Sequence, residues 1–359
     1  MTDPTPTAAA VAPPRPATPP GPPALIDALP GSRPFHLDGW MERAGFGPAL
    51  SAVLVFVFAF VLFNLAGAVA IGVALVSDFV ASGAEPTPEA VTGLMEAATT
   101  DRPHLMLGSN AVGQLIGFAL FALLAARLAT RDWKPFLRVR TPDGAGLGLA
   151  ALGWVALYPI VLWAGELNRM IPLPEPLVEF ETMQTDMLEG LLMGGQLSTA
   201  FLLFTVALTP AICEELIFRG YLQRQVERRF GLVASIVAVG VLFGLYHLRL
   251  SQAIPLSILG VYLGFVVWAT GSVWTGALVH LLNNGLAVLA TAYVRETPGL
   301  DMDTIDEASV PIWAVLVAAL ALAVVVRGIL ARRHAVTGGR PDAQLAVPAP
   351  TPFSTPLPA

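Results

Sequence analysis

The stretch that decides the fold is residues 197–219, LSTAFLLFTVALTPAICEELIFR. Its first 17 residues, 197–213, carry no charge. A helix needs about 17 to 25 such residues to cross the hydrocarbon core of a bilayer. Glu214, Glu215 and Arg219 then follow within the same apolar segment. Because ionisable side chains are costly inside a membrane, those that occur there are functional candidates. The stretch therefore predicts a transmembrane helix that carries a polar site.

The composition of the whole chain agrees with a membrane protein. Of 359 residues, 55% are hydrophobic and 13% are charged, against about 25% charged in ordinary soluble domains. The formal net charge of -6 provides no basic surface of the kind that binds phosphates, so we exclude nucleic-acid binding. Membrane lipids are the expected surroundings. Cys213 is the single cysteine, which excludes an intrachain disulfide and paired Cys/His zinc spacing.

Eight apolar segments are near or above the length needed to span a membrane. They are 47–77, 105–129, 145–165, 197–218, 231–248, 254–270, 273–294 and 311–330. We therefore predict an all-α fold, a polytopic membrane helical bundle of about eight transmembrane helices. The fifth and sixth segments are short, and only Gly271 and Ser272 separate the sixth from the seventh. A count of seven spans stays open on this evidence.

The distribution of positive charge predicts the orientation. With eight spans and a cytoplasmic N-terminus, all Lys and Arg residues fall on the cytoplasmic side except Arg102, Arg169, Arg249 and Arg295. This bias follows the positive-inside rule, and a merger of two spans would break it. The loops 166–189 and 296–307, both acidic, then lie outside. We expect an integral protein of the bacterial inner (plasma) membrane with both termini in the cytoplasm.

Composition shifts divide the chain into five regions. Residues 1–30 and 336–359 are rich in proline and are expected to be disordered tails. Residues 31–196 form an N-terminal membrane region with three spans. Residues 197–295 hold the candidate catalytic core, and 296–335 comprise an outer loop and the last span.

Three segments of the predicted core carry polar residues, and in two of them these residues are at helical spacing. Glu215 and Arg219 are four residues apart, as are His280 and Asn284, so each pair lies on one helix face. If the fourth helix continues to a turn near Gly231, Glu214 and His247 both lie about 24 Å from that turn, which would allow contact. His280 is only about 14 Å from Gly271, so its helix must tilt or start deeper to join them.

Each residue also has a purely structural interpretation. Glu215 and Arg219 would serve equally well as a charge-neutralising clamp. His247 would lie at the membrane interface, and His280 with Asn284 would provide interhelical hydrogen bonds. The occurrence of Glu, His and His-plus-Asn on three separate spans favours a reactive site, because structural hydrogen bonding does not require that particular set.

Several hydrolytic mechanisms are excluded by missing residues. No aspartate occurs between Asp186 and Asp301, which removes a paired-aspartate site and a Ser-His-Asp triad. The sequence has no His-Glu-x-x-His helix and no Gly-x-Ser-x-Gly elbow. What remains is a glutamate and a histidine that can activate water, together with a histidine and an asparagine that can donate hydrogen bonds to an oxyanion. This set suits hydrolysis of an acyl or peptide bond.

The core contains the motifs Glu214-Glu215-x-x-x-Arg219, Phe243-x-x-x-His247 and His280-x-x-x-Asn284, with Thr270-Gly-Ser-Val-Trp before the last. This combination resembles the CAAX prenyl protease and bacteriocin-processing family of intramembrane proteases. The resemblance covers about residues 197–295. It implies that Glu214 activates water with His247, that Glu215 and Arg219 hold the site, and that His280 and Asn284 stabilise the tetrahedral intermediate.

The resemblance implies an intramembrane endopeptidase, a hydrolase that acts on a peptide or lipidated protein substrate. Eukaryotic members remove three residues from prenylated proteins, whereas many bacterial members have no assigned substrate. Two other functions stay open: a non-proteolytic scaffold or bacteriocin-immunity protein of the same family, and a small proton-coupled transporter. The lack of internal repeats argues against the transporter.

A metal cofactor is a separate question. Glu214, His247 and His280 form a candidate zinc set with one open position for water. The same residues also suit a metal-free glutamate mechanism. We favour the metal-free mechanism, because Asn284, one turn from His280, is well placed as an oxyanion donor beside an uncoordinated His280.

Overall fold

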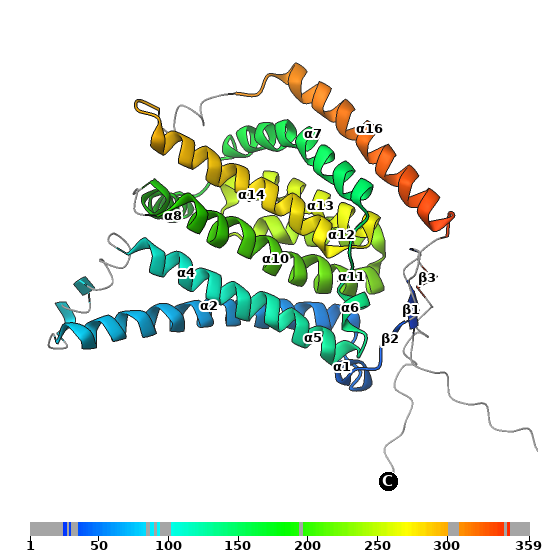
Figure 1. Cartoon of the computed structure of the whole chain (residues 1–359), viewed down its shortest axis with the longest axis horizontal. Helices are drawn as coiled ribbons and strands as arrows, with labels where there is room; N and C mark the ends of the chain where they lie inside the picture. Colours follow the sequence, from blue (N-terminus) through cyan, green and yellow to red (C-terminus); the bar gives the residue numbers. More distant parts are fainter. Residues whose placement is uncertain are drawn as a thin grey trace, which may run out of the picture.

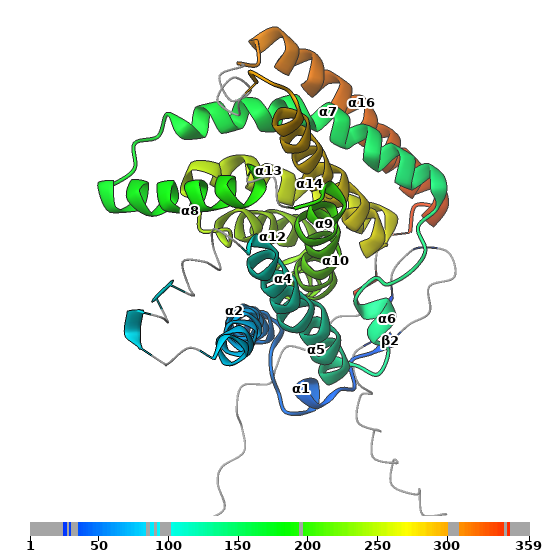
Figure 2. The same cartoon turned by 60° about the vertical axis from the view of Figure 1, so that its left-hand side comes forward.

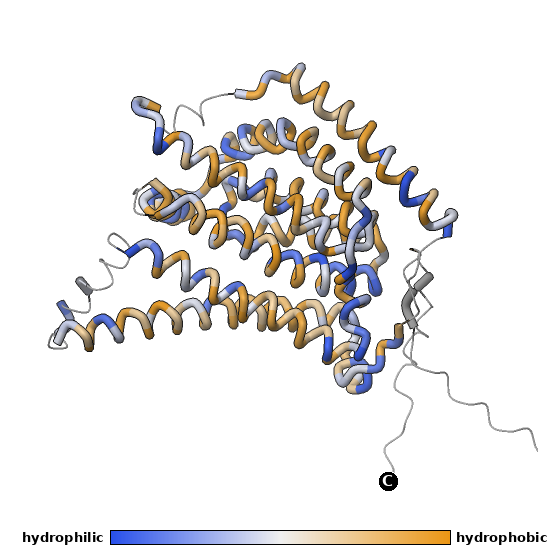
Figure 3. Tube along the Cα trace, in the orientation of Figure 1, coloured by the Kyte–Doolittle hydropathy of each residue, from blue (hydrophilic) through white to orange (hydrophobic). Residues whose placement is uncertain are grey.

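A computed structural model describes residues 24–26, 29, 35–83, 87–89, 92–93, 102–193, 197–300, 309–340 and 343–344 of the chain. Within these residues the fold is a bundle of long helices that run side by side (Figure 1). Apolar residues cover the lengths of the helices, and hydrophilic residues gather towards the two ends of the bundle (Figure 3). This distribution is that of a membrane-spanning bundle.

The helices agree with the predicted spans. Seven are long and apolar enough to cross a membrane: α2 (Pro48–Ser82), the continuous helix Pro103–Ala129, α7 (Gly144–Arg169), the continuous helix Thr199–Phe230, Leu250–Thr270, α14 (Val273–Glu296) and α16 (Ile312–Thr337). A shorter apolar helix, α12 (Leu232–Leu245), corresponds to the predicted fifth span. Gly271, with a φ of 65°, ends the sixth helix and separates it from α14. The prediction of an all-α bundle of about eight spans is confirmed.

Three of these helices are composite. The second comprises α4 (Pro103–Gln114), a π-helical segment η1 (Leu115–Leu120) and α5 (Phe121–Ala129). The fourth comprises α9 (Thr199–Leu202), the π-helix η2 (Leu203–Leu208), α10 (Thr209–Glu215), the π-helix η3 (Leu216–Leu222) and α11 (Gln223–Phe230). The sixth begins with a 3-10 turn, η4 (Leu250–Gln252), and continues as α13 (Ala253–Thr270). Since π-helical segments are uncommon and often mark functional sites, the two in the fourth helix point to the candidate core.

The smaller elements lie between and before the spans. They are α1 (Trp40–Arg43), α6 (Trp133–Phe136), α8 (Glu175–Met193) and three short strands, β1 (Ala24–Ile26), β2 (Phe35–His36) and β3 (Ala343–Gln344). The strands pair antiparallel in the order β2-β1-β3. Most of the two proline-rich tails falls outside the described residues, so their predicted disorder and the five-region division stay predictions.

The segment 166–189, interpreted above as an acidic outer loop, is largely helical. The last turn of α7 and most of α8 occupy it. Helix α8 runs crosswise to the long helices at the end of the bundle where α9 begins (Figures 1 and 2). Glu181 and Leu191 of α8 are buried, so contacts with the bundle, rather than hydrophobicity along the whole segment, stabilise this helix.

Helices α12 and α13 form a close antiparallel pair. A Cβ at Gly240 would lie 2.6 Å from the Val261 backbone nitrogen, and one at Gly260 would lie 2.6 Å from the Gly240 carbonyl oxygen. Small residues allow such close backbone approach in membrane helices. With 14 residues, α12 is only about 21 Å long, shorter than a hydrocarbon core of about 30 Å. Helix α12 alone is therefore too short to cross such a core.

The predicted orientation can be tested with single cysteines at two exposed positions, Glu296 at the end of α14 and Arg229 in α11. In intact cells, a membrane-impermeant maleimide should label Glu296→Cys and should label Arg229→Cys only after the membrane is permeabilised. Cys213 is buried and should add little background. Reversed labelling would mean that the orientation is wrong.

Candidate functional site

The fourth helix is irregular where the polar residues begin, and Pro210 accounts for part of this. Proline has no backbone N–H, so the carbonyl of Val206, four residues earlier, loses its helical partner. The Asn284 side chain of α14 donates from Nδ2 to this oxygen at 3.1 Å. A carbonyl that would be costly to leave unpaired in a membrane is thus satisfied by a neighbouring helix, and α14 is fixed beside η2.

Glu215 and Arg219 form an ion pair inside the bundle. Arg219 Nη1 lies 2.7 Å from Glu215 Oε1, and both side chains are completely buried. Arg219 Nη2 donates to the Gly260 carbonyl of α13 at 3.0 Å, and its guanidinium lies 4.3 Å from the centre of the Phe243 ring of α12. The pair therefore links three helices.

His280 of α14 lies between the two glutamates. Its Nδ1 is 3.2 Å from Glu215 Oε1, and its Nε2 is 4.0 Å from Glu214 Oε2. Since a carboxylate only accepts, Nδ1 carries the hydrogen of the first contact. The side chain of His280 is almost fully buried, so it shares its enclosed surroundings with both carboxylates.

The start of α14 explains how His280 reaches this depth. Ser272 Oγ donates to the Arg140 carbonyl at 2.5 Å, and Val273 N donates to the Arg138 carbonyl at 3.0 Å. Ser272 and Val273 are buried, so α14 begins inside the protein instead of at its surface. Gly276, one turn before His280, then leaves room for the carboxylate, because a Cβ there would lie 2.5 Å from Glu215 Oε2.

Glu214 has one oxygen fixed and one oxygen without a protein partner. The Tyr246 hydroxyl donates to Glu214 Oε1 at 2.5 Å. Oε2 is buried, has no hydrogen bond within the described part of the chain, and faces His280. Tyr246 was not among the predicted site residues, although a phenol next to His247 in an apolar segment is a signal for it.

His247 lies beside the site. Its Nδ1 contacts the Phe243 carbonyl oxygen at 2.7 Å, and its ring centre is 4.3 Å from that of Tyr246. In the described residues no hydrogen bond or ion pair joins His247 to Glu214. The hydrogen bond to Glu214 from this segment comes instead from Tyr246, the neighbour of His247.

The candidate zinc set does not fit this arrangement. The described residues include no group of three or more His, Cys, Asp or Glu side chains positioned to hold a metal ion. His280 directs Nδ1 to Glu215, and no hydrogen bond or ion pair joins His247 to Glu214 in the part of the chain that the structure describes. The metal-free glutamate mechanism stays a prediction.

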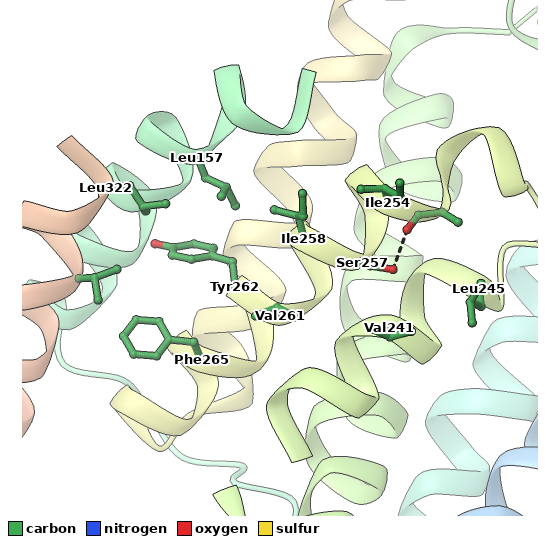
Figure 4. A pocket seen from close by; sticks show the side chains of 12 residues that line it. Leu157, Val241, Leu245, Ile254, Ser257, Ile258, Val261, Tyr262, Phe265 and Leu322 are labelled. Carbon is green, nitrogen blue, oxygen red and sulfur yellow. Dashed lines mark hydrogen bonds between the residues drawn. The ribbon is translucent and has the colours of Figure 1, made fainter. Parts of the chain in front are cut away.

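A separate apolar groove of about 650 Å³ lies between α7, α12, α13 and α16 (Figure 4). None of the predicted site residues lines it. Its two hydroxyl groups bond within the protein, Ser257 Oγ to the Ala253 carbonyl at 2.6 Å and the Tyr262 hydroxyl to the Ala150 carbonyl at 2.7 Å. The groove thus presents hydrocarbon surface and no reactive group.

Comparison with known proteins supports the family resemblance over the core. Residues 196–286 match the family model described as type II CAAX prenyl endopeptidase Rce1-like. The matched segment is about a quarter of the chain and contains all six predicted site residues. No curated protein and no solved structure matches the chain. The expected resemblance to CAAX prenyl proteases is confirmed for this segment.

The Glu215–Arg219 pair predicts a specific stability pattern. Glu215→Ala leaves a buried guanidinium without its carboxylate, which should cost on the order of 3–5 kcal/mol. The double variant Glu215→Ala with Arg219→Ala should recover part of that loss, because both buried charges are gone. Thermal unfolding in detergent measures both effects, with the exposed Glu189→Ala as control. A Glu215→Ala variant as stable as wild type would show that the pair is not a clamp.

The close approach at Gly276 predicts a second pattern. The methyl group of Gly276→Ala would overlap Glu215 Oε2 and, at 2.6 Å, Val267 Cγ2, so this variant should lose about 1–3 kcal/mol of stability. Gly285→Ala on the same helix is the matched control, since its nearest neighbour outside the helix lies at 3.8 Å. Equal melting temperatures for the two variants would contradict the packing argument.

Proposed function

We propose that the chain is an intramembrane endopeptidase that hydrolyses peptide bonds of membrane-associated or lipidated peptides through a water activated by Glu214. The observation that carries this proposal is the pairing of Glu214 Oε2 with His280 Nε2 at 4.0 Å, both almost completely buried. The distance between these two atoms is too long for a direct hydrogen bond, and a water molecule could bridge them. The family match of the surrounding segment supports the same reaction class.

Glu214 is the proposed general base and acid. The Tyr246 hydroxyl holds Oε1, which leaves Oε2 to accept a proton from the water. The water oxygen forms a bond to the carbonyl carbon of the scissile peptide, whose oxygen takes up the negative charge. Glu214 then returns the proton to the leaving amine as the C–N bond breaks. Protons and electrons balance without another reactant.

His280 and Asn284 are the proposed oxyanion donors. In this mechanism His280 acts as an imidazolium beside the two buried carboxylates. With Nδ1 bonded to Glu215, the protonated ring presents Nε2–H to the developing oxyanion. Asn284 donates one amide hydrogen to Val206 and has a second available, because a side-chain amide carries two.

Glu215, Arg219 and His247 complete the proposed site. Glu215 and Arg219 fix the position of the His280 ring through the 3.2 Å contact. His247 donates from Nδ1 to the Phe243 carbonyl, which leaves Nε2 as an acceptor that can orient the attacking water. Its role is thus auxiliary to that of Glu214.

The test uses purified protein in lipid nanodiscs and a farnesylated peptide that ends in Cys-aliphatic-aliphatic-X, with release of the C-terminal tripeptide followed by mass spectrometry. Glu214→Gln keeps the shape of the side chain but removes the base, so the rate should fall by about 10²–10⁴-fold. Its melting temperature should stay near that of wild type.

Cys213→Ala is the matched control, since Cys213 is a buried neighbour on the same helix without a proposed role, and it should retain cleavage. Cleavage by Glu214→Gln near the wild-type rate would refute the assignment of the base. Cleavage of an unprenylated membrane peptide in place of the farnesylated one would keep the mechanism and change the substrate class.

A further inference from the structure

The turn that carries Tyr246 and His247 has an unfavourable backbone conformation. Leu248, the residue after His247, has a φ of 56°, a left-handed conformation that costs free energy for a residue with a Cβ. Arg138 is the one other non-glycine residue with positive φ in the described part of the chain. Such a conformation persists where surrounding contacts hold it, so the contacts of this turn decide where His247 lies.

Helix α8 supplies the first of these contacts. Glu181 is 8% exposed, and its carboxylate accepts from Leu250 N at 2.5 Å and from Ser251 N at 3.2 Å. One turn further along the same helix face, Thr185 Oγ1 accepts from Arg249 Nη2 at 2.9 Å. Glu181 bonds two consecutive backbone N–H groups, whereas Thr185 bonds only a side chain, so Glu181 is the contact from α8 that fixes the backbone of the turn.

Helix α7 holds the turn from a second side. Asn168 donates from Nδ2 to the Leu250 carbonyl at 2.9 Å and accepts at Oδ1 from Ile254 N at 2.8 Å. Residues 250–254 are thus bonded to two helices that are distant in sequence. A hollow of about 470 Å³, lined in part by Asn168, Glu181 and Ser251, adjoins these contacts. Since this side of the turn is not closely packed, hydrogen bonds rather than packing fix its position.

We propose that Glu181 is a positioning residue that sets the place of His247, and through Tyr246 that of Glu214, by holding the backbone of the α12–α13 turn. The effect on catalysis rests on the function proposed above. The structural part, that Glu181 fixes the turn and the His247 ring, is independent of that function. Glu181 touches none of the reacting groups, so it acts only through the turn.

The experiment compares the wild-type chain with Glu181→Ala, Glu181→Gln and the control Glu179→Gln, an exposed carboxylate on the same helix. Hydrogen–deuterium exchange in nanodiscs is followed for a peptide that covers residues 246–254. Glu181→Ala should raise the exchange there by about tenfold, because local opening becomes easier. Glu181→Gln should give a smaller rise, since the amide oxygen still accepts, and Glu179→Gln should give none.

The rate of modification by diethyl pyrocarbonate is a second measurement, which reports the accessibility of each histidine and needs no substrate. His247 is half-buried and His280 is buried, so His247 should react faster in Glu181→Ala than in wild type while His280 stays unreactive. If Glu181→Ala does not accumulate in folded form, the same two measurements on Glu181→Gln decide. Unchanged exchange at 246–254 and unchanged His247 reactivity would overturn the proposal.

Kinetics then separate positioning from general stability. With the farnesylated peptide, kcat should fall by about tenfold to a hundredfold in Glu181→Ala, as expected for a misplaced catalytic group, with KM nearly unchanged and partial recovery in Glu181→Gln. A mobile turn with an unchanged kcat would overturn the catalytic part. Absence of cleavage by wild type itself would refute the proposed function, while the exchange and modification results would still test the role of Glu181.

Discussion

The buried ion pair between Glu215 and Arg219 is the interaction on which the core of the bundle depends. Each ion carries a desolvation cost of several kcal/mol, which is offset only if the remaining donors and acceptors are well placed. The offsetting contacts come from three other helices: the Phe243 ring of α12, the Gly260 carbonyl of α13 and His280 of α14. These helices are therefore held around the fourth helix by the same requirement that keeps the two charges buried.

The need to hydrogen-bond buried polar groups also explains the irregular fourth helix. Pro210 has no N–H to donate to the Val206 carbonyl, and the Asn284 side chain donates to this carbonyl instead. Two π-helical segments flank the seven residues of α10 that end in the paired glutamates. In hydrocarbon, backbone groups released in this way must be bonded by other parts of the protein. The irregular helix and the close approach of α14 are thus two consequences of one constraint. They fix Asn284 beside Val206 and bring His280 to the glutamates.

The turn between α12 and α13 carries backbone N–H and C=O groups that need partners. Glu181 of α8 and Asn168 of α7 supply them. Helix α8 crosses the end of the bundle near this turn (Figure 2), so a segment predicted to be an acidic loop bonds the turn that follows His247. The proposed chemistry at Glu214 and the proposed role of Glu181 are linked by the seven residues from Tyr246 to Gln252.

The sequence by itself determined the features that follow from local geometry. Apolar length predicted the spans, including the short fifth one, and the four-residue spacing of Glu215 and Arg219 predicted their pairing, because distances within a helix are fixed by its repeat. The motifs also indicated the family of the core. Only the tertiary structure decided that Tyr246 bonds Glu214, that α14 starts deep enough for His280 to contact Glu215, and that α8 holds the turn beside His247. The starting depth of a helix and the partner of a turn depend on residues far away in the chain, such as Arg138 and Glu181, and no periodicity within a segment encodes those contacts.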